Sequence, residues 1–535
     1  MIISDGLASL PTADVCIVGA GPVGLALAFR LEALGRSVLI LESGPSSSWQ
    51  GRTELLAGNH ALPTVSMSRG IGGTSALWGG RCVAFDDIDF EERPHVPFSG
   101  WPIPHSSLSR HYPGAARFLQ TGEIPSPGED GEEDFTLNSV ETWSGKPVIA
   151  PLYEPRLIHS ENITLAMGAA VSGLELGKDG RVRALHLEGR GELPTPNEVV
   201  LAAGGLETAR LLLALRKEHP TLFGSADGPL GRFYQGHLTG YLAVAHLDNE
   251  EIVQRLSFAS DSQGHRYRRR LQPSRHQQAS HQLLNIVFWL DAISISDSSH
   301  GSGSLSLLYL LLRFSGTYRW LSRGLAPRTG PKSKGEIRRH LRNMKVRGAS
   351  PTRIISMLKN LWKDGERGTL TRSSGRFLLR YHAEQAPNPA SRVQLREGSG
   401  GATALEVDYR IEDRDMASVL QAHHLLDQWL RSKGYGRLEY LQPEEDRFRS
   451  VLVQAFDGYH QIGLARMSDD PDLGVVDADC RVRGVANLYL AGASVFPTGG
   501  HANPTLPAVA LALRLAEHLA GMTRQKSRVT EQTVS

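Results

Sequence analysis

Cysteine is scarce in this sequence, with three in 535 residues, and this scarcity argues against several classes of protein. Cys16, Cys82 and Cys480 form no C-x-x-C pair, so the chain carries neither the disulfide framework of a small secreted domain nor a zinc pattern. Reduced thiols are typical of a cytoplasmic protein. Gly-x-Ser-x-Gly and His-Glu-x-x-His motifs are also missing, so a hydrolase is not indicated and no metal is expected.

Long apolar runs are missing as well. None reaches the roughly 18 consecutive apolar residues that a transmembrane helix needs. The N-terminus, MIISDGLASLPTAD, lacks the basic start and apolar core of a signal peptide. With 40% hydrophobic residues the chain can still bury a large core, so we expect a globular protein localised in the cytoplasm.

Net charge is low, at +2, but one segment concentrates positive charge. Residues 313–380 contain eighteen Lys or Arg and three acidic residues. Apolar residues between these cations predict amphipathic helices. They are Leu341, Met344, Ile354, Ile355, Met357, Leu358, Leu361 and Trp362. We interpret the segment as solvated helices that cover a domain, with a peripheral membrane or protein contact as the alternative. No nucleic-acid-binding module accompanies the charge, so nucleic acid is not an expected partner.

The N-terminal region contains a dinucleotide-binding pattern. Residues 13–44 predict a buried strand, a glycine turn, a helix and a second strand that ends in Glu42. Gly19 allows the tight turn, Gly21 lets the backbone approach a pyrophosphate, and Gly24 lets the helix pack on the strand. Glu42 can accept hydrogen bonds from ribose hydroxyls. This pattern fits FAD and NAD equally.

The C-terminal region predicts a return to the same sheet. Residues 485–497, VANLYLAGASVFP, predict a strand that ends on Gly492 and Ala493, where backbone can lie against a cofactor. An extended cofactor that contacts both ends of the chain is more typical of FAD than of NAD. The following PTGGHANPTLPA predicts a helix with Asn503 as its N-cap and Pro504 at its first position. The positive end of that helix favours negative charge on a ligand.

Four further blocks lie between these two ends. They are RGIGGTSALWGGRC (69–82), SGWPIPHSSLSRHYPGAARFL (99–119), VVLAAGGLETARLLL (199–213) and YHQIGLARMSDDPDLGVVD (459–477). Together with the two ends, they make the chain similar to the glucose-methanol-choline (GMC) family of FAD-dependent alcohol oxidoreductases. The most specific part is the Tyr-His block followed by Gly-Val-Val-Asp and then Asn-Pro-Thr. Within the family the chain most resembles the sugar-oxidising branch of pyranose and glycoside oxidases.

The resemblance implies an α/β fold, α+β overall, in which a Rossmann-type FAD-binding domain carries an inserted, mainly antiparallel-sheet substrate domain with extra helices. The expected FAD-binding segments are 1–95, 150–235 and 451–524, and the substrate-domain segments are 96–149 and 236–450. The basic helical insert at 313–380 belongs to the substrate domain. Candidate strands in the middle of the chain, SRVQLRE and ALEVDYRI, agree with this division. The polar tail at 525–535 is expected to be disordered.

The resemblance also implies FAD as the cofactor and a set of contacts to it. Some pyranose oxidases attach the flavin through a histidine in the glycine-rich turn, but the matching residue here is Leu77, which offers no nucleophile. We therefore expect non-covalent FAD. Thr74 and Ser75 are predicted to hydrogen-bond the flavin edge near N5 and O4, and Trp78 to pack nearby. Further predicted contacts are Ser43, Gly73, Gly79, Val171, Ala203, Asn503, Pro504 and Thr505.

Oxidation of an alcohol by FAD needs a base for the hydroxyl proton, while the carbon-bound hydrogen passes as hydride to flavin N5. His460 aligns with the family's active-site histidine and is the predicted base. Asn503 matches the second active-site position and is predicted to hydrogen-bond the substrate oxygen, with its carbonyl left for the N-cap. Glu384 and Gln385 are candidate substrate contacts or surface residues. His501 either lines the mouth of the pocket or simply belongs to the turn.

These residues predict an FAD-dependent oxidase or dehydrogenase that acts on the CH-OH group of a sugar, glycoside or aminosugar, including an aminoglycoside. Its partners are this small-molecule alcohol and an electron acceptor, either oxygen or an unidentified carrier. Two alternatives stay open. One is a redox-silent relative with lyase or decarboxylase chemistry, and the other is a non-enzymatic flavoprotein that docks through its basic insert.

Overall fold

The structure is a computed structural model of the chain. It describes residues 1–3, 10–44, 53–125, 134–194, 197–224, 227–314, 336–350, 352, 354–355, 375–397 and 403–534. Four of the apolar residues predicted on amphipathic helices, Met357, Leu358, Leu361 and Trp362, lie outside the described residues. No helix in the described part of the chain combines the length and the apolar character that crossing a bilayer requires.

One region of the molecule is built on a six-stranded sheet, in the order β1-β7-β3-β2-β11-β20, and all of its pairings are parallel. Because a parallel sheet is covered on both faces, its strands are apolar throughout, and every residue of β2 (VCIV) and β3 (VLILE) is buried. The pairing of β20 with β11 confirms that the C-terminal region returns to this sheet. The strands are β1 (Ile2–Ile3), β2 (Val15–Val18), β3 (Val38–Glu42), β7 (Ile163–Met167), β11 (Glu198–Leu201) and β20 (Leu488–Leu490).

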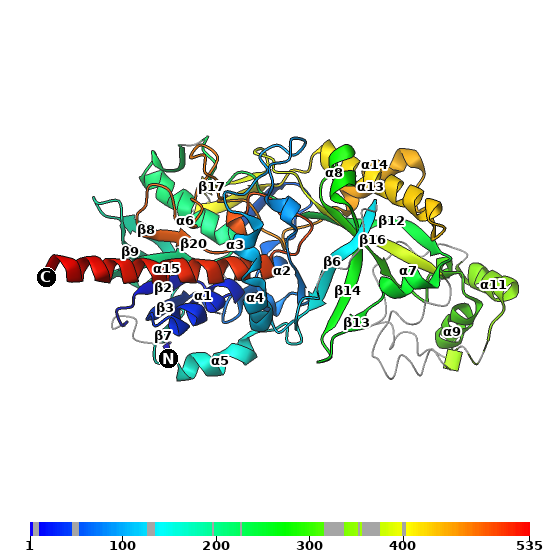
Figure 1. Cartoon of the computed structure of the whole chain (residues 1–535), viewed down its shortest axis with the longest axis horizontal. Coiled ribbons are helices and arrows are strands. Elements are labelled where there is room, and N and C mark those ends of the chain that lie inside the picture. Colours follow the sequence, from blue (N-terminus) through cyan, green and yellow to red (C-terminus); the bar gives the residue numbers. More distant parts are fainter. Residues whose placement is uncertain are drawn as a thin grey trace.

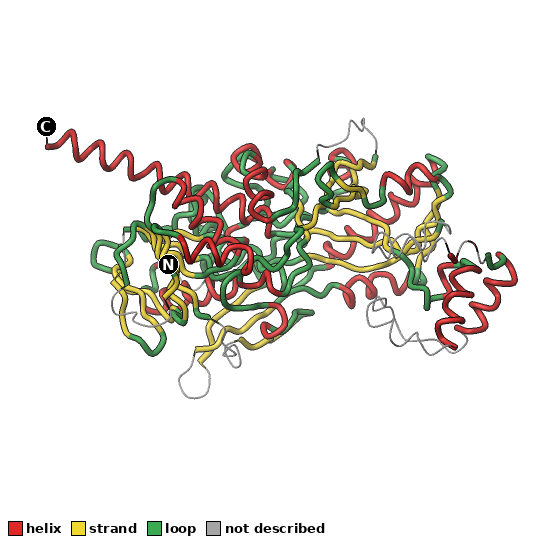
Figure 2. Tube along the Cα trace, turned by 90° about the horizontal axis from the view of Figure 1, so that it is seen from below, coloured by secondary structure: helices red, strands yellow, loops and turns green. Residues whose placement is uncertain are grey.

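Helices cover this parallel-sheet region (Figure 1). Helix α15 lies along α1, and an ion pair of 2.7 Å between Arg30 and Glu517 joins them. Helix α15 continues to Val534 and its end projects beyond the body of the molecule (Figure 2), where the sequence predicts a disordered tail from residue 525. No glycine or proline follows Gly521 to stop the helix. The helices here are α1 (Pro22–Ala33), α4 (Tyr112–Leu119), α5 (Ala150–His159), α6 (Gly205–Glu218) and α15 (Thr505–Val534).

The glycine turn between β2 and α1 has the close packing that its motif predicts. Gly19 has a φ of 109°, a left-handed value that favours glycine. A Cβ on Gly24 would lie 2.1 Å from the carbonyl oxygen of Gly19. The first turn of α1 therefore lies directly against the end of β2.

The other region is built on an eight-stranded sheet in the order β19-β12-β16-β15-β14-β6-β5, with β13 paired to β14, and its pairings are antiparallel (Figure 1). Helices α13 and α14 cover it, and their core includes Phe288, Tyr381 and Trp429. The elements are β5 (Arg81–Val83), β6 (Phe135–Trp143), β12 (His237–Leu247), β13 (Ala259–Ser260), β14 (Arg266–Pro273), β15 (Ile286–Asp291), β16 (Arg376–Glu384), β19 (Gly436–Tyr440), α13 (Asp413–Ser432) and α14 (Glu444–Gln454).

The register between β12 and β16 decides which side chains of this sheet meet. Thr239 pairs with His382, and Tyr241 pairs with Arg380. Because side chains alternate across a strand, Arg380 and His382 lie on the same face of β16. This face turns toward the parallel-sheet region.

Two predicted strands belong to a different sheet from the one expected. SRVQLRE and ALEVDYRI form β17 (Arg392–Glu397) and β18 (Thr403–Asp408), and β18 pairs in parallel with β4 (Thr53–Ala57). Val393, Leu405 and Val407 lie in the core of the parallel-sheet region, although the sequence assigns them to the substrate domain. The segment Trp101–Leu119 also packs into that core. A second three-stranded sheet contains β8 (Val171–Leu176), β9 (Val182–Leu187) and β10 (Gly191–Pro194).

The basic segment contains one of its predicted helices among the described residues, α11 (Glu336–Arg347), which packs on α9 (Gly303–Phe314). The side chain that α11 buries is His340, whose Nδ1 lies 3.0 Å from the hydroxyl of Ser306. Leu341, which the amphipathic pattern places inward, is 52% exposed. A polar contact therefore anchors this helix in place of the predicted apolar face.

Candidate active site

A cavity of about 1080 Å³ lies between the two regions. The glycine turn and the carboxyl ends of the parallel strands line one part of it, and β12 and β16 line another. Ligands of open parallel sheets bind beyond the carboxyl ends of the strands, so the cavity lies where such a ligand is expected. Its volume is at the upper end of the range for small-molecule sites and suits an extended dinucleotide together with a substrate.

The backbone of the cavity wall fits a dinucleotide. A Cβ on Gly21 or on Gly492 would meet no atom within 4 Å and would stand in open cavity space. Both glycines line the cavity, so they leave room for a ligand to approach the backbone. Gly21 directly precedes the first turn of α1, whose free N–H groups attract a phosphate.

Glu42 lies at the end of β3, where the motif predicts a ribose contact. Its Oε1 accepts hydrogen bonds from the amides of Gly44 and Gly70, both at 3.0 Å. Its Oε2 accepts one hydrogen bond of 2.9 Å from the amide of Ala20. A carboxylate oxygen can accept a second bond, so Oε2 keeps capacity for a ribose hydroxyl.

The other predicted cofactor residues line the same cavity, with one exception. Gly24 lies behind the turn and serves the packing of α1. Ser75 donates to the carbonyl of Gly72 at 2.7 Å, and Trp78 donates to the carbonyl of Pro147 at 2.6 Å, so both polar groups are occupied by the protein. The lining residues are Gly19, Ser43, Gly73, Thr74, Ser75, Trp78, Gly79, Val171, Ala203, Ala493, Asn503, Pro504 and Thr505.

His460 and Asn503, predicted from blocks 43 positions apart, meet at the cavity. Nε2 of His460 lies 3.3 Å from Nδ2 of Asn503. Asn503 is not the N-cap that the sequence predicts, because its buried Oδ1 has no hydrogen-bond partner among the described residues. The carbonyl of Pro504 accepts the first helical bond, 2.9 Å from the amide of Ala508, so the helix begins one residue later. Oδ1 of Asn503 is therefore available to a ligand, and Nδ2 keeps a second N–H besides the one near His460.

Asp457 fixes the loop that carries His460. Its Oδ1 accepts hydrogen bonds from the amides of Gly458 (2.7 Å), Tyr459 (2.9 Å) and His460 (3.0 Å). Its Oδ2 lies 3.3 Å from Nδ1 of His460. Burial raises the pKa of the Asp457 carboxyl, but His460 and these hydrogen bonds outweigh it and hold that pKa well below its ordinary value. The carboxylate is therefore ionised beside the imidazole.

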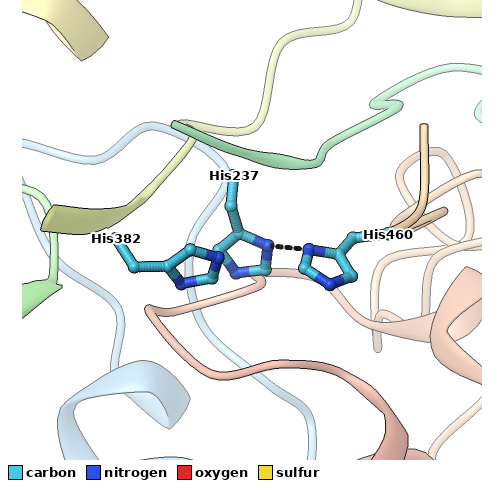
Figure 3. A group of neighbouring side chains, drawn as sticks. All are labelled: His237, His382 and His460. Atoms are coloured by element: carbon cyan, nitrogen blue, oxygen red, sulfur yellow. Dashed lines mark hydrogen bonds between the residues drawn. The ribbon is translucent and has the colours of Figure 1, made fainter. Parts of the chain in front are cut away.

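Two further histidines, which the sequence analysis missed, stand beside His460 (Figure 3). Nδ1 of His237, on β12, lies 2.8 Å from Nδ1 of His460. His382, on β16, stacks on His237 with ring centroids 4.3 Å apart. Burial, and then the neighbouring His460, lower the pKa of His237 to about 3. Burial, followed by His237 and His460, holds the pKa of His382 well below its ordinary value.

The ring nitrogens of these three histidines lie within 4.8 Å of one another, close enough to hold a metal ion. Three imidazoles can bind zinc. Here, however, the Nδ1 atoms of His237 and His460 share a hydrogen bond, and Nδ1 of His382 lies 2.8 Å from the carbonyl oxygen of His501. These contacts engage the Nδ1 atoms of all three rings within the protein. The absence of a metal stays a prediction.

The three predicted substrate residues lie outside the cavity lining. Glu384 is buried and forms a bidentate ion pair with Arg93, whose guanidinium nitrogens lie 2.8 and 2.6 Å from the two carboxylate oxygens. Gln385 accepts hydrogen bonds from the Gly236 amide and the Tyr409 hydroxyl, at 2.9 and 2.8 Å.

His501 is also buried, with Nε2 at 2.9 Å from the carboxylate of Asp86. Because their polar atoms are occupied within the protein, Glu384, Gln385 and His501 hold the architecture around the site. Strand β16 does reach the cavity, but through Arg380 and His382.

Comparisons with known proteins agree with this arrangement. Residues 387–512 match the model described as GMC oxidoreductase, and residues 17–64 match the NAD(P)-binding Rossmann-like domain. The 6'''-hydroxyparomomycin C oxidase of Streptomyces lividus is 24% identical over 95% of this chain and 92% of its own length. The paromamine 6'-oxidase of Streptomyces fradiae is 32% identical, but over only 25% of this chain and 24% of its own.

A solved structure supports the fold. Pyridoxine 4-oxidase, from an organism given as Mesorbium loti, aligns with a TM-score of 0.51 over 95% of this chain and 99% of its own, at 18% identity. The family match and the Rossmann-like domain together imply a flavin cofactor. The protein is an oxidoreductase, and its chain is similar to the GMC oxidoreductase family.

Proposed function

We propose that the protein catalyses the FAD-dependent oxidation of an alcohol group on a sugar or glycoside, with His460 as the base. The pairing of Nε2 of His460 with Nδ2 of Asn503, 3.3 Å apart at the wall of the cavity, carries this proposal. An alcohol oxygen placed against both atoms can give its proton to the imidazole while it accepts a hydrogen bond from the amide. When bound, FAD supplies the acceptor for the hydride that leaves the same carbon.

The surroundings of His460 suit a proton acceptor at Nε2. For Nε2 to accept, the neutral ring must carry its proton on Nδ1. Nδ1 faces the carboxylate of Asp457 at 3.3 Å and the Nδ1 of His237 at 2.8 Å, and both can accept from it. Asp457 therefore selects this tautomer and stabilises the positive charge that His460 gains with the substrate proton.

His237 is suited to remain neutral next to that charge. Its pKa of about 3 leaves it unprotonated across the neutral range, so its Nδ1 can accept the hydrogen bond from His460. A second positive ring at this place would repel the proton that His460 must take. We therefore assign His237 as a positioning residue and His460 as the base.

We propose that FAD is bound without a covalent link. Leu77 lines the cavity at the position where some relatives carry a histidine, and it is 50% exposed there. An alkyl side chain cannot bond to the flavin ring. Acid precipitation of the purified protein should release all of the yellow colour into the supernatant, whereas a coloured pellet would contradict the assignment.

The sugar class is proposed from the names of similar proteins. Besides the two aminoglycoside oxidases, the C-glycoside 3-oxidase of Microbacterium trichothecenolyticum is 32% identical over 22% of each chain. All three names describe oxidation of a glycosidic compound. Either oxygen or a separate carrier is the proposed acceptor of the electrons.

Anaerobic mixing with a panel of sugars and glycosides tests the proposal. We expect at least one alcohol to bleach the oxidised flavin band, and reoxidation by oxygen or by a dye then identifies the type of acceptor. A lyase, a decarboxylase or a docking flavoprotein would keep its flavin oxidised with every alcohol. That result would overturn the proposed function.

A further inference from the structure

The end of the cavity formed by the antiparallel sheet carries two positive side chains. Arg81, on β5, and Arg380, on β16, both line the cavity, with side chains 29% and 35% exposed. Trp143 and Tyr241 line the same end. The Arg81 guanidinium lies over the ring of Trp143 at 5.9 Å, and that of Arg380 over Tyr241 at 5.3 Å. The aromatic rings thus hold both cations at the wall.

The place of Arg380 in the strand relates it to the reacting groups. Arg380 lies two residues before His382 on the same face of β16, which separates their Cα atoms by about 7 Å along the strand. His382 stacks on His237, which contacts His460. A group held by Arg380 would therefore lie in the same cavity as the proposed base, on the strand face that carries His382.

The carboxylates near these arginines do not line the cavity, and they are fewer than the arginines. Glu141 is fully buried and serves both Arg81, at 2.6 Å, and Arg268, at 2.7 Å. Asp291 lies 3.8 Å from Arg380 and 3.6 Å from Arg268. With the buried Arg270, which also faces Asp86, four arginines face three carboxylates. Burial lowers the pKa of Arg81 below its ordinary value. The positive charges of Arg268 and Arg380 also lower it, while the charge of Glu141 raises it.

The acidic residues that do line the cavity are already engaged. Glu42 accepts from backbone amides at the dinucleotide end, and Glu207 pairs with Arg210 at 2.6 Å. Asp457 accepts hydrogen bonds from four backbone amides, those of His237, Gly458, Tyr459 and His460. The three carboxylates that line the cavity are thus already engaged by protein groups, including Asp457 beside the imidazole of His460. Arg81 and Arg380, in contrast, present two guanidinium groups to an anion.

We propose that the natural substrate is an alcohol that carries an anionic group, a carboxylate or a phosphate, and that Arg81 and Arg380 bind this group. The inference rests on the proposed function and narrows it to acidic sugars. It separates this protein from relatives named for aminoglycosides, whose substrates are cationic. Guanidinium groups bind both carboxylate and phosphate through paired, charge-assisted hydrogen bonds.

Four sugars with one ring but different charge test the proposal on the holoenzyme. They are D-glucose, D-glucosamine, D-glucuronate and D-glucose 6-phosphate. We measure anaerobic flavin reduction by the wild type and calorimetric binding to the His460→Ala holoenzyme, in which chemistry is slowed. We expect an anionic sugar to bind about 10- to 100-fold more tightly than glucose, and glucosamine to bind more weakly than glucose. The two anionic sugars distinguish carboxylate from phosphate.

Variants of Arg380 assign the binding to this place. Arg380→Gln should remove the preference for the anionic sugar, Arg380→Lys should keep part of it, and FAD should stay bound in both. Arg437→Gln, which removes an exposed arginine from β19 of the same sheet, is the matched control and should keep the preference.

Three results would overturn the proposal. The first is equal binding of glucose and both anionic sugars, and the second is tighter binding of glucosamine than of glucose. The third is an Arg380→Gln variant that loses FAD but still prefers the anionic sugar. If neutral sugars reduce the flavin and anions bind no better, the proposed function stands and this inference fails. If an anion binds through Arg380 but no alcohol reduces the flavin, the proposed function fails, and the inference about the substrate fails with it although Arg380 binds anions.

Discussion

The two regions of this molecule encode their parts of the site in different ways. In the parallel-sheet region, the glycine turn and the predicted ribose contact Glu42 come from one continuous stretch, Val15–Glu42. In the antiparallel-sheet region, His237, His382 and Arg380 come from strands that are more than a hundred positions apart. Only strand register brings these side chains together, so a local motif identifies the first region but not the second.

The largest expected effect is that of removing His460, which should slow the chemical step without weakening cofactor binding. His460→Ala should slow flavin reduction about 10²- to 10⁴-fold, because the variant loses its general base. The bound FAD should be unchanged, since His460 is not among its proposed contacts. Stopped-flow reduction and the flavin content of the purified variant measure the two effects. His424→Ala, at an exposed position on α13, is the control, and an unchanged rate for His460→Ala would remove this residue from the mechanism.

A second change tests whether Glu384 belongs to the architecture of the antiparallel-sheet region or to its pocket. Glu384→Gln leaves the buried guanidinium of Arg93 without its charged partner, which should cost about 3–5 kcal/mol of unfolding free energy. The ratio of rates for different sugars should be unchanged, because Glu384 does not line the cavity. Denaturant unfolding and a sugar panel measure these effects. An altered sugar preference at unchanged stability would restore Glu384 as a substrate contact.

In the parallel-sheet region, a substitution at the glycine turn should weaken the binding of FAD. Gly21→Val adds a side chain that meets no protein atom within 4 Å but fills cavity space, and the backbone there, at φ −70°, accepts valine. Crowding of this kind costs 1–3 kcal/mol, so the affinity for FAD should fall about 10- to 100-fold while the fold is kept. Titration of the apoprotein with FAD measures this. Gly521→Val, also in open space, is the control, and equal FAD affinity of Gly21→Val and the wild type would contradict the assignment.

The smallest expected effect concerns acid stability, which depends on buried histidines of the antiparallel-sheet region. Burial lowers the pKa of His423 to about 4, against about 6.5 in the unfolded chain. Between these values the unfolded chain binds the proton and the folded chain does not. The free energy of unfolding should therefore decrease as the pH decreases, by at most about 1.4 kcal/mol per pH unit for this residue.

His423→Gln should flatten that slope between pH 6.5 and 4. Its side chain stays polar but does not titrate, and it lies away from the cavity lining, so flavin reduction should be kept. Denaturant unfolding at several pH values provides the measurement. A slope equal to that of the wild type would show that other groups set the acid sensitivity.

Prediction from the sequence succeeded where neighbouring residues determine the conformation. The turn at Gly19 and the packing at Gly24 follow from the size of a glycine and the geometry of a strand that leads into a helix. The meeting of His460 with Asn503 is different. These residues are 43 positions apart, and only the resemblance to a family paired them.

The substrate side could not be predicted in the same way. In the stretch YHAEQ, Glu384 and Gln385 are the predicted substrate contacts, but the residue that lines the cavity is His382, on the same strand face as Glu384. That face carries a pocket residue and a buried ion-pair residue two positions apart. The partner strand, not the stretch itself, decides which of them meets a cavity.

The contacts from Asn503 to His460 and on to His237 run from one region of the molecule into the other. Asn503 and His460 belong to segments that pack with the parallel sheet, while His237 is part of β12. If these residues have the proposed roles, turnover requires the two sheets to be correctly placed relative to each other as well as correctly folded. Flavin binding at the glycine turn of the parallel-sheet region does not make the same demand.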